Sequence, residues 1–167
     1  MGLTKNSPEE GARQGYVVRK LRPADLERGF LETLGNLSDV GGLSPREARG
    51  LFASMKRSPL YQVLVAVESD GEVVGATTLI VEQKFIHRGG LAGHIEDVAV
   101  RKGHEGKGIG GSVVRAAVER ARELGCYKVI LDCKEELVGF YEGLGFRSRD
   151  VGMRIDLKPG PPANRDT

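Results

Sequence analysis

The stretch Gly93–Gly111, GHIEDVAVRKGHEGKGIGG, decides the fold. Its first part, Ile95–Val100, is an apolar run with two carboxylates and is typical of a strand. A glycine-rich loop follows, and from Ile109 apolar residues recur at spacings of three and four, which predicts a helix with one buried face. Strand, glycine-rich turn and helix present bare backbone N–H groups and the positive end of a helix dipole to a phosphate. The stretch therefore predicts a phosphate-bearing cofactor at Gly106–Gly111.

Length and composition exclude several classes of protein. The chain has 167 residues, enough for one domain with a core, and a formal net charge of +2, too small to indicate a nucleic-acid partner. No apolar run is long enough to span a membrane, and the polar N-terminal residues contain no signal segment, so we expect a cytoplasmic protein. Two cysteines, Cys126 and Cys133, are too few for a disulfide framework or a four-ligand zinc site. No metal is expected.

Periodicity and turn signals predict one domain over residues 15–157, with disordered tails at 1–14 and 158–167. Ser44, Pro45 and Glu47 form a complete helix start signal, and Ser69-Asp70-Gly71 is a hairpin turn. In chain order we expect strand Tyr16–Leu21, helix Pro23–Leu34, helix Pro45–Lys56, strands Tyr61–Glu68, Glu72–Gln83 and Gly93–Val100, helix 109–124, strand Tyr127–Asp132, helix Glu135–Gly143 and strand Arg147–Leu157.

This order predicts an α+β fold with a mixed, mostly antiparallel sheet. The strands before the glycine loop form a meander, and strand 95–100, helix 109–124 and strand 127–132 form one parallel, right-handed βαβ crossover. Strand 127–132 is apolar on both faces and is therefore expected inside the sheet.

Three kinds of phosphate-binding loop compete as interpretations of the glycine-rich stretch. A Walker loop needs Lys-Ser/Thr after its last glycine, and Gly111-Ser112 lacks the lysine. The dinucleotide fingerprint fits Gly106, Gly108 and Gly111, with Asp132 about 20 residues further on, but five residues separate the strand from the first glycine. The third pattern, R/Q-x-x-G-x-G/A, is the pyrophosphate loop of the GNAT acetyltransferases, which the chain resembles. A tight turn without a ligand is the simplest alternative.

Further stretches resemble one branch of that superfamily, the glucosamine-6-phosphate N-acetyltransferases. They are Lys84–His87, Gly93–Val100, Cys126–Cys133 and Val138–Glu142, and the resemblance covers roughly residues 15–157. It implies a GNAT fold with helices on both sheet faces and direct transfer of acetyl from acetyl-CoA to the amine of D-glucosamine 6-phosphate. It also implies a homodimer with the substrate site near its interface. Glu105 departs from the pattern, because many members of the superfamily carry Arg or Gln there.

The resemblance also implies which residues hold acetyl-CoA. Backbone groups of the strand and the loop, helped by Lys107, bind the cofactor, and a free N–H near Val98 stabilises the thioester oxygen. Tyr141 protonates the leaving thiolate. The expected cofactor-binding residues are Val98, Ala99, Val100, Gly106, Lys107, Gly108, Ile109, Gly110, Gly111 and Tyr141.

Asp132 ends an apolar predicted strand, where an acid is costly to bury unless it is paired or used. The resemblance implies that it contacts the amine of the substrate, and it is the first candidate to orient or deprotonate it. A helix cap is the alternative role. Adjacent strand residues point to opposite faces, so only one of Glu96 and Asp97 faces a given cleft, and Glu96 is the third catalytic candidate. The expected substrate-binding residues are Ser38, Lys84, Phe85, Ile86, His87, Glu96, Asp97, Val98, Tyr127, Lys128, Asp132 and Arg154.

Two other functions stay open. The same fold could acetylate another small amine or a protein amine, or it could sense acyl-CoA without chemistry. Phe140 is expected in the core. Cys126 and Cys133 are expected to pack rather than to carry an acyl group, since the sequence shows nothing that would lower a thiol pKa.

Overall fold

The computed structural model describes residues 15–157, and the two predicted tails lie outside this range. The chain divides into two compact units, Met1–Leu131 and Asp132–Thr167, which are described separately. Within residues 15–157, none of the helices has both the length and the apolar character that a membrane span requires.

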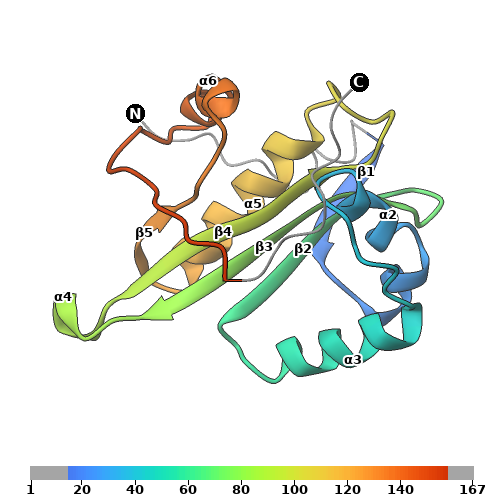
Figure 1. Ribbon diagram of the computed structural model, residues 1–167, viewed down its shortest axis with the longest axis horizontal. Helices are drawn as coiled ribbons and strands as arrows, with labels where there is room; N and C mark the ends of the chain where they lie inside the picture. The colour runs from blue at the N-terminus through green and yellow to red at the C-terminus, as the bar shows by residue number, and fades with distance from the viewer. Residues whose placement is uncertain (1–14, 158–167) are drawn as a thin grey trace. The chain divides into compact units, whose positions relative to one another are not determined.

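A five-stranded sheet forms the centre of the first unit (Figure 1). The first four strands pair antiparallel in chain order, and the last two are parallel. Helix α5 (Ile109–Glu123) makes the parallel crossover, as predicted. The strands are β1 (Tyr16–Lys20), β2 (Tyr61–Glu68), β3 (Val73–Gln83), β4 (Leu91–Val100) and β5 (Cys126–Ile130).

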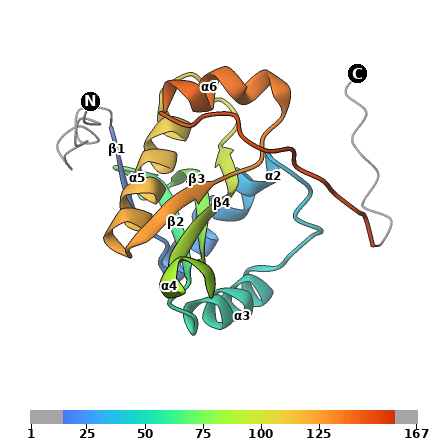
Figure 2. The same ribbon diagram turned by 90° about the vertical axis from the view of Figure 1, so that its left-hand side faces the viewer.

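Helices cover both faces of this sheet because successive strand residues point to opposite sides. Val65 and Val67 of β2 pack on the side of η1 (Pro23–Glu27), α2 (Phe30–Gly35) and α3 (Pro45–Lys56). Ala66, between them, packs with Ile109 and Val113 of α5. Figure 2 shows α5 on one side of the strands and α2 and α3 on the other. The predicted α+β fold with helices on both faces is confirmed.

Close packing fixes the start of α5 on β3. A Cβ added to Gly75 would lie 2.4 Å from Cγ2 of Ile109, the first residue of α5, and Ile109 is itself buried. Only a residue without a side chain allows this approach. Gly75 therefore sets the height at which the helix begins above the sheet.

The predicted helix Pro23–Leu34 is wrong as one element. It divides into the 3₁₀ turn η1 and the helix α2, and Gly29 between them has φ 80°. An added Cβ there would lie 2.9 Å from Arg101 Nη1 and 3.2 Å from the Val73 carbonyl oxygen. The helix is interrupted at Gly29 because the backbone there lies against Arg101 and Val73, which are distant in the sequence. Helix α3, by contrast, has the predicted bounds, with Ser44 and Glu47 forming the capping box.

The second unit contains η2 (Glu135–Leu137) and α6 (Val138–Gly143), close to the predicted helix Glu135–Gly143. The predicted strand Arg147–Leu157 is wrong, because residues 147–157 form no strand. A strand needs a neighbour for its backbone N–H and C=O groups, and the described part of this unit holds no other strand. Four apolar side chains of segment 147–157 are exposed: Val151, Met153, Ile155 and Leu157.

Strand β5 is also not interior, contrary to prediction. It is the last strand of the sheet as described, and Tyr127 and Ile130 are exposed. It ends at Ile130, before Asp132. The prediction of an interior strand assumes that further sheet lies beyond β5. Within residues 15–157 no strand pairs with the outer edge of β5, because the predicted strand Arg147–Leu157 does not form.

Candidate functional site

A bulge interrupts β4 where the two carboxylates lie. Ala76 pairs with Ala99 and Thr78 with Glu96, so that Asp97 and Val98 together oppose Thr77. Asp97 has φ 52°, in the left-handed region that Asp tolerates better than most residues. A bulge removes its extra residue from the ladder and redirects backbone groups. The bulge lies where the resemblance leads us to expect a free backbone N–H near Val98. Because the bulge interrupts the alternation of side chains along β4, the face to which Asp97 points does not follow from its position in the sequence.

Thr77 is the side chain that supports the bulge from inside the sheet. It is fully buried, and its hydroxyl donates to the Glu96 carbonyl oxygen at 3.1 Å. On the strand itself, His94 Nε2 lies 3.2 Å from Glu96 Oε1, at the i, i+2 spacing that shares a strand face. Sequence reasoning missed both residues. The available signals were a threonine in an apolar strand and a histidine two residues before a carboxylate.

The segment that follows the bulge is arranged to receive an anion. Gly108, with φ 77°, directly precedes α5, whose first turn has no acidic side chain. The first N–H groups of a helix lack intrahelical partners, and the helix dipole favours negative charge there. Val98 and Val100 pack with Ile109 in one cluster, so the strand end and the helix start are held together. All predicted cofactor-binding residues except Tyr141 lie in this strand–loop–helix segment.

A basic and aromatic cluster lies at the other end of β4. The single turn α4 (Ile86–Gly89) forms the tip of the β3–β4 hairpin, which extends beyond the neighbouring strands in Figure 1. The His87 ring lies 4.3 Å from the Tyr127 ring, and Lys128 Nζ lies 5.8 Å from the Tyr127 centroid. Lys84 Nζ lies 2.6 Å from Glu82 Oε2. The structure thus brings His87, Tyr127 and Lys128 together, while Phe85 and Ile86 are exposed.

The predicted substrate residues of the first unit form two groups, not one. Lys128 pairs with Ala92, four residues before Glu96, which corresponds to roughly 13 Å along a strand. Ser38 lies in the loop after α2, where its N–H donates to the Leu34 carbonyl oxygen at 3.1 Å. The basic cluster and the bulge thus lie at different levels along β4.

In the second unit, Tyr141 is buried among aromatic rings. Its ring centroid lies 4.9 Å from that of Phe140 and 5.9 Å from that of Phe146, both edge to face. Burial, and then the nearby Cys133, raise the pKa of the Tyr141 hydroxyl above its ordinary value. The hydroxyl therefore keeps its proton at neutral pH and can donate it. Phe140 is 42% exposed, so its predicted place in the core is wrong.

The two other predicted residues of this unit differ in their surroundings. Asp132 is the first residue of the unit, and the backbone at Gly152 passes close to it: an added Cβ would lie 3.2 Å from Asp132 Oδ1. Arg154 is exposed, and its Nε donates to Asp156 Oδ1 at 2.7 Å. Asp132 thus lies beside backbone that belongs to the same segment as Arg154.

The cysteines and possible metal ligands add little chemistry. Burial raises the pKa of the Cys126 thiol, which disfavours the thiolate that an acyl-cysteine would require. Cys133 is expected to pack, but it is exposed. Over residues 15–157, no three His, Cys, Asp or Glu side chains gather where they could hold a metal ion.

Comparison with known proteins adds an independent result. The family model for the Acetyltransferase (GNAT) family matches residues 31–146 and crosses the boundary between the two units. A glucosamine 6-phosphate N-acetyltransferase of Candida albicans is 42% identical over 141 residues, which are 84% of this chain and 95% of that protein. One from Oryza sativa subsp. japonica is 42% identical over 147 residues, 87% of this chain and 89% of that protein. The crystal structure of glucosamine-6-phosphate N-acetyltransferase from Arabidopsis thaliana matches with a TM-score of 0.83 and 33% identity, over 86% of this chain and 99% of that one.

Proposed function

The chain belongs to the GNAT acetyltransferase family, in its glucosamine 6-phosphate N-acetyltransferase branch, and we propose that it transfers acetyl from acetyl-CoA to the amine of D-glucosamine 6-phosphate. The product is N-acetylglucosamine 6-phosphate, for UDP-N-acetylglucosamine synthesis. The observation that carries the proposal is the bulged strand β4, which leads through a glycine loop into the start of α5. We also propose that residues 15–157 act as one domain and that the protein is cytoplasmic.

In this proposal acetyl-CoA binds along the first unit. Its pyrophosphate accepts hydrogen bonds from N–H groups of Gly106–Gly111 at the start of α5, with Lys107 adding positive charge. Its pantetheine arm pairs with the backbone of Val98–Val100. The thioester oxygen, which gains negative charge as the amine attacks, accepts a hydrogen bond from the N–H group at the bulge.

Transfer then needs two proton movements and no covalent enzyme intermediate. The amine nitrogen attacks the thioester carbon, the C–S bond breaks, and the thiolate takes a proton from Tyr141. The amine gives its surplus proton to a carboxylate, for which Asp132 and Glu96 are the candidates. Burial of Tyr141 among aromatic rings keeps its hydroxyl protonated at neutral pH, so the proton is present when the thiolate forms. No step requires a metal.

We further propose a homodimer in which the basic cluster of one chain serves the substrate site of the other. The position of the basic cluster supports this, because the β3–β4 hairpin tip beside it extends beyond the neighbouring strands (Figure 1). Adjacent exposed apolar residues at the hairpin tip, Phe85 and Ile86, support it as well, since contiguous exposed apolar surface often marks an interface. Further large apolar side chains that the chain exposes are Tyr127, Ile130, Val151, Met153, Ile155 and Leu157.

The first test is thiol release from acetyl-CoA, followed spectroscopically, with glucosamine 6-phosphate compared with unphosphorylated glucosamine. Turnover with the phosphorylated sugar alone is expected. Equal turnover with both would retain the acetyltransferase and reject the phosphate site. No turnover with either, while acetyl-CoA still binds, would favour another amine or a module that only binds acyl-CoA.

A further inference from the structure

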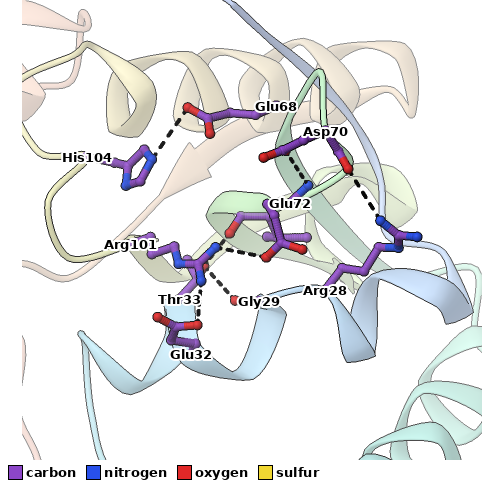
Figure 3. Close-up of polar contacts among 10 residues, drawn as sticks. Arg28, Gly29, Glu32, Thr33, Glu68, Asp70, Glu72, Arg101 and His104 are labelled. Atoms are coloured by element: carbon purple, nitrogen blue, oxygen red, sulfur yellow. Dashed lines mark hydrogen bonds and ion pairs between the residues drawn. The ribbon is translucent and has the colours of Figure 1, made fainter.

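Polar side chains connect α2 with the start of β3 and with the end of β4, where the proposed cofactor loop begins. The contacts of Arg101 and Thr33 appear in Figure 3. Arg101 donates from Nη2 to Glu32 Oε2 at 2.6 Å and from Nη1 to Glu72 Oε2 at 3.0 Å. The buried Thr33 hydroxyl donates to the carbonyl oxygens of Gly29, at 2.8 Å, and Val73, at 2.9 Å. These bonds hold α2 against β3 and against the residue that follows β4.

A further contact reaches the loop itself. Asn36, which directly follows α2, donates from Nδ2 to the Val100 carbonyl oxygen at 2.8 Å and to Glu105 Oε1 at 3.1 Å. The other carboxylate oxygen of Glu105 accepts the N–H of Gly103 at 2.7 Å. One side-chain amide therefore links α2, the last residue of β4 and the loop between β4 and α5.

We propose that Asn36 and Glu105 form a positioning pair that holds the loop 101–108 in the shape that binds acetyl-CoA and ties it to the loop that carries Ser38. The inference rests on the proposed binding of acetyl-CoA at Gly106–Gly111. It explains why an acid can stand in this loop: the carboxylate serves the backbone of the loop rather than the phosphate.

The chemistry of a carboxylate suits this role. It accepts at both oxygens, so it can receive the Asn36 amide and the Gly103 N–H together, whereas a glutamine has one acceptor oxygen. Its own backbone N–H, the Gly103 N–H and the Asn36 amide lower the pKa of Glu105, so that it stays ionised at neutral pH. A charge that only faced the cofactor would repel its phosphates, and removing it would then tighten binding. A positioning carboxylate predicts the opposite effect of its removal.

The test compares Asn36→Ala, Glu105→Gln and the double variant with wild type, by calorimetric titration of acetyl-CoA and by steady-state kinetics. Arg46→Ala, an exposed change on α3 outside the loop, is the control. Each single variant should weaken acetyl-CoA binding and raise its KM about fivefold to tenfold, the usual net effect of one lost hydrogen bond, with kcat changed less than twofold. The double variant should bind no more weakly than the worse single variant, because the two residues act together. Arg46→Ala should match wild type.

The outcomes separate this inference from the proposed function. If wild type does not bind acetyl-CoA, the proposed function fails and the inference falls with it. If wild type binds and Asn36→Ala binds equally well, only the inference is overturned. Tighter binding by Glu105→Gln would also overturn it, because the carboxylate would then act as a charge alone. If Asn36→Ala does not fold, Asn36→Asp is the second variant. It replaces the amide donor with a carboxylate that faces the carboxylate of Glu105, and it should give the same rise in the KM for acetyl-CoA.

Discussion

At the scale of single residues, the Thr77 hydroxyl connects the sheet interior to the proposed oxyanion site, because it donates to the carbonyl of the residue before the bulge. Thr77→Val keeps the shape but leaves that carbonyl without this donor. We expect kcat to fall about tenfold and the free energy of unfolding to fall by about 1 kcal/mol. Thr78→Val, the adjacent change on the opposite strand face, is the control for kinetics. An unchanged kcat in Thr77→Val would show that the hydroxyl does not hold the bulge in its active form.

Tyr141 gives a second prediction at this scale. Tyr141→Phe should lower kcat about 100-fold with little change in either KM, because the variant keeps the ring and loses the proton. Since burial raises the Tyr141 pKa, the protonated form persists to a pH above the ordinary tyrosine range. Wild-type kcat should therefore fall on the alkaline side only above that range, and Tyr141→Phe should lack this fall. A large parallel rise in the KM for acetyl-CoA would instead make Tyr141 a binding residue.

At the scale of elements, the position of α5 depends on Gly75. Gly75→Ala places a methyl group against the buried Ile109, and overpacking of this kind lowers the free energy of unfolding by about 1–3 kcal/mol. Because Ile109 begins the helix at the cofactor loop, the KM for acetyl-CoA should rise as well. Gly50→Ala on α3, where nothing lies within 4 Å of an added Cβ, should be neutral or stabilising. Urea unfolding and kinetics of the two variants check this, and equal behaviour would refute it.

An ion pair between Arg19 of β1 and the buried Asp25 of η1 connects the first two elements of the chain. Asp25 accepts Arg19 Nη1 at 2.7 Å, Arg19 Nη2 at 2.8 Å and the Arg22 N–H at 2.7 Å. Burial alone would raise the pKa of Asp25, but these hydrogen bonds outweigh it and the pKa lies below its usual value. The contribution to stability is therefore present above the ordinary pKa of an aspartate, and it is lost as the pH falls through the lower pKa of the folded state.

Asp25→Asn should lower the free energy of unfolding at neutral pH by about 2–3 kcal/mol. The variant should also lose less stability than wild type between neutral and acidic pH, because it has no carboxylate to protonate there. Urea unfolding over this pH range measures both effects. Asp39→Asn, at an exposed loop carboxylate, is the control. Parallel acid curves for wild type and Asp25→Asn would contradict the assignment.

At the scale of the whole molecule, the proposed homodimer has a sharp test in mixed dimers. Tyr141→Phe and Lys128→Ala should each have low activity alone. If Lys128 serves the site of the partner chain, a dimer with one chain of each kind contains one site with both wild-type residues, and coexpression restores activity. If both residues serve the site of their own chain, every site carries a defect and activity does not return. Sedimentation velocity of wild type should give a dimer, and Met153→Asp should give a monomer.

Several elements could be predicted from the sequence because their signals are local. The capping box at Ser44 started α3 correctly, the turn at Ser69-Asp70-Gly71 joined β2 to β3, and the apolar periodicity from Ile109 identified α5. Each signal is complete within a few turns of chain. The predicted cofactor segment is therefore continuous in the structure, from the end of β4 into α5.

The errors fall where a distant residue decides the local structure. Gly29 breaks the predicted first helix because Arg101 and Val73 approach it, and residues 147–157 form no strand because a strand needs a partner. The bulge at Asp97 depends on its pairing with β3, and Asn36 meets Glu105 only because α2 lies at the end of β4. Sequence alone thus determined the type of fold and the strand–loop–helix segment at its centre, whose patterns are short-range. Tertiary structure decided the bulge and the contacts of the loop, because these depend on which distant backbones lie within hydrogen-bond reach.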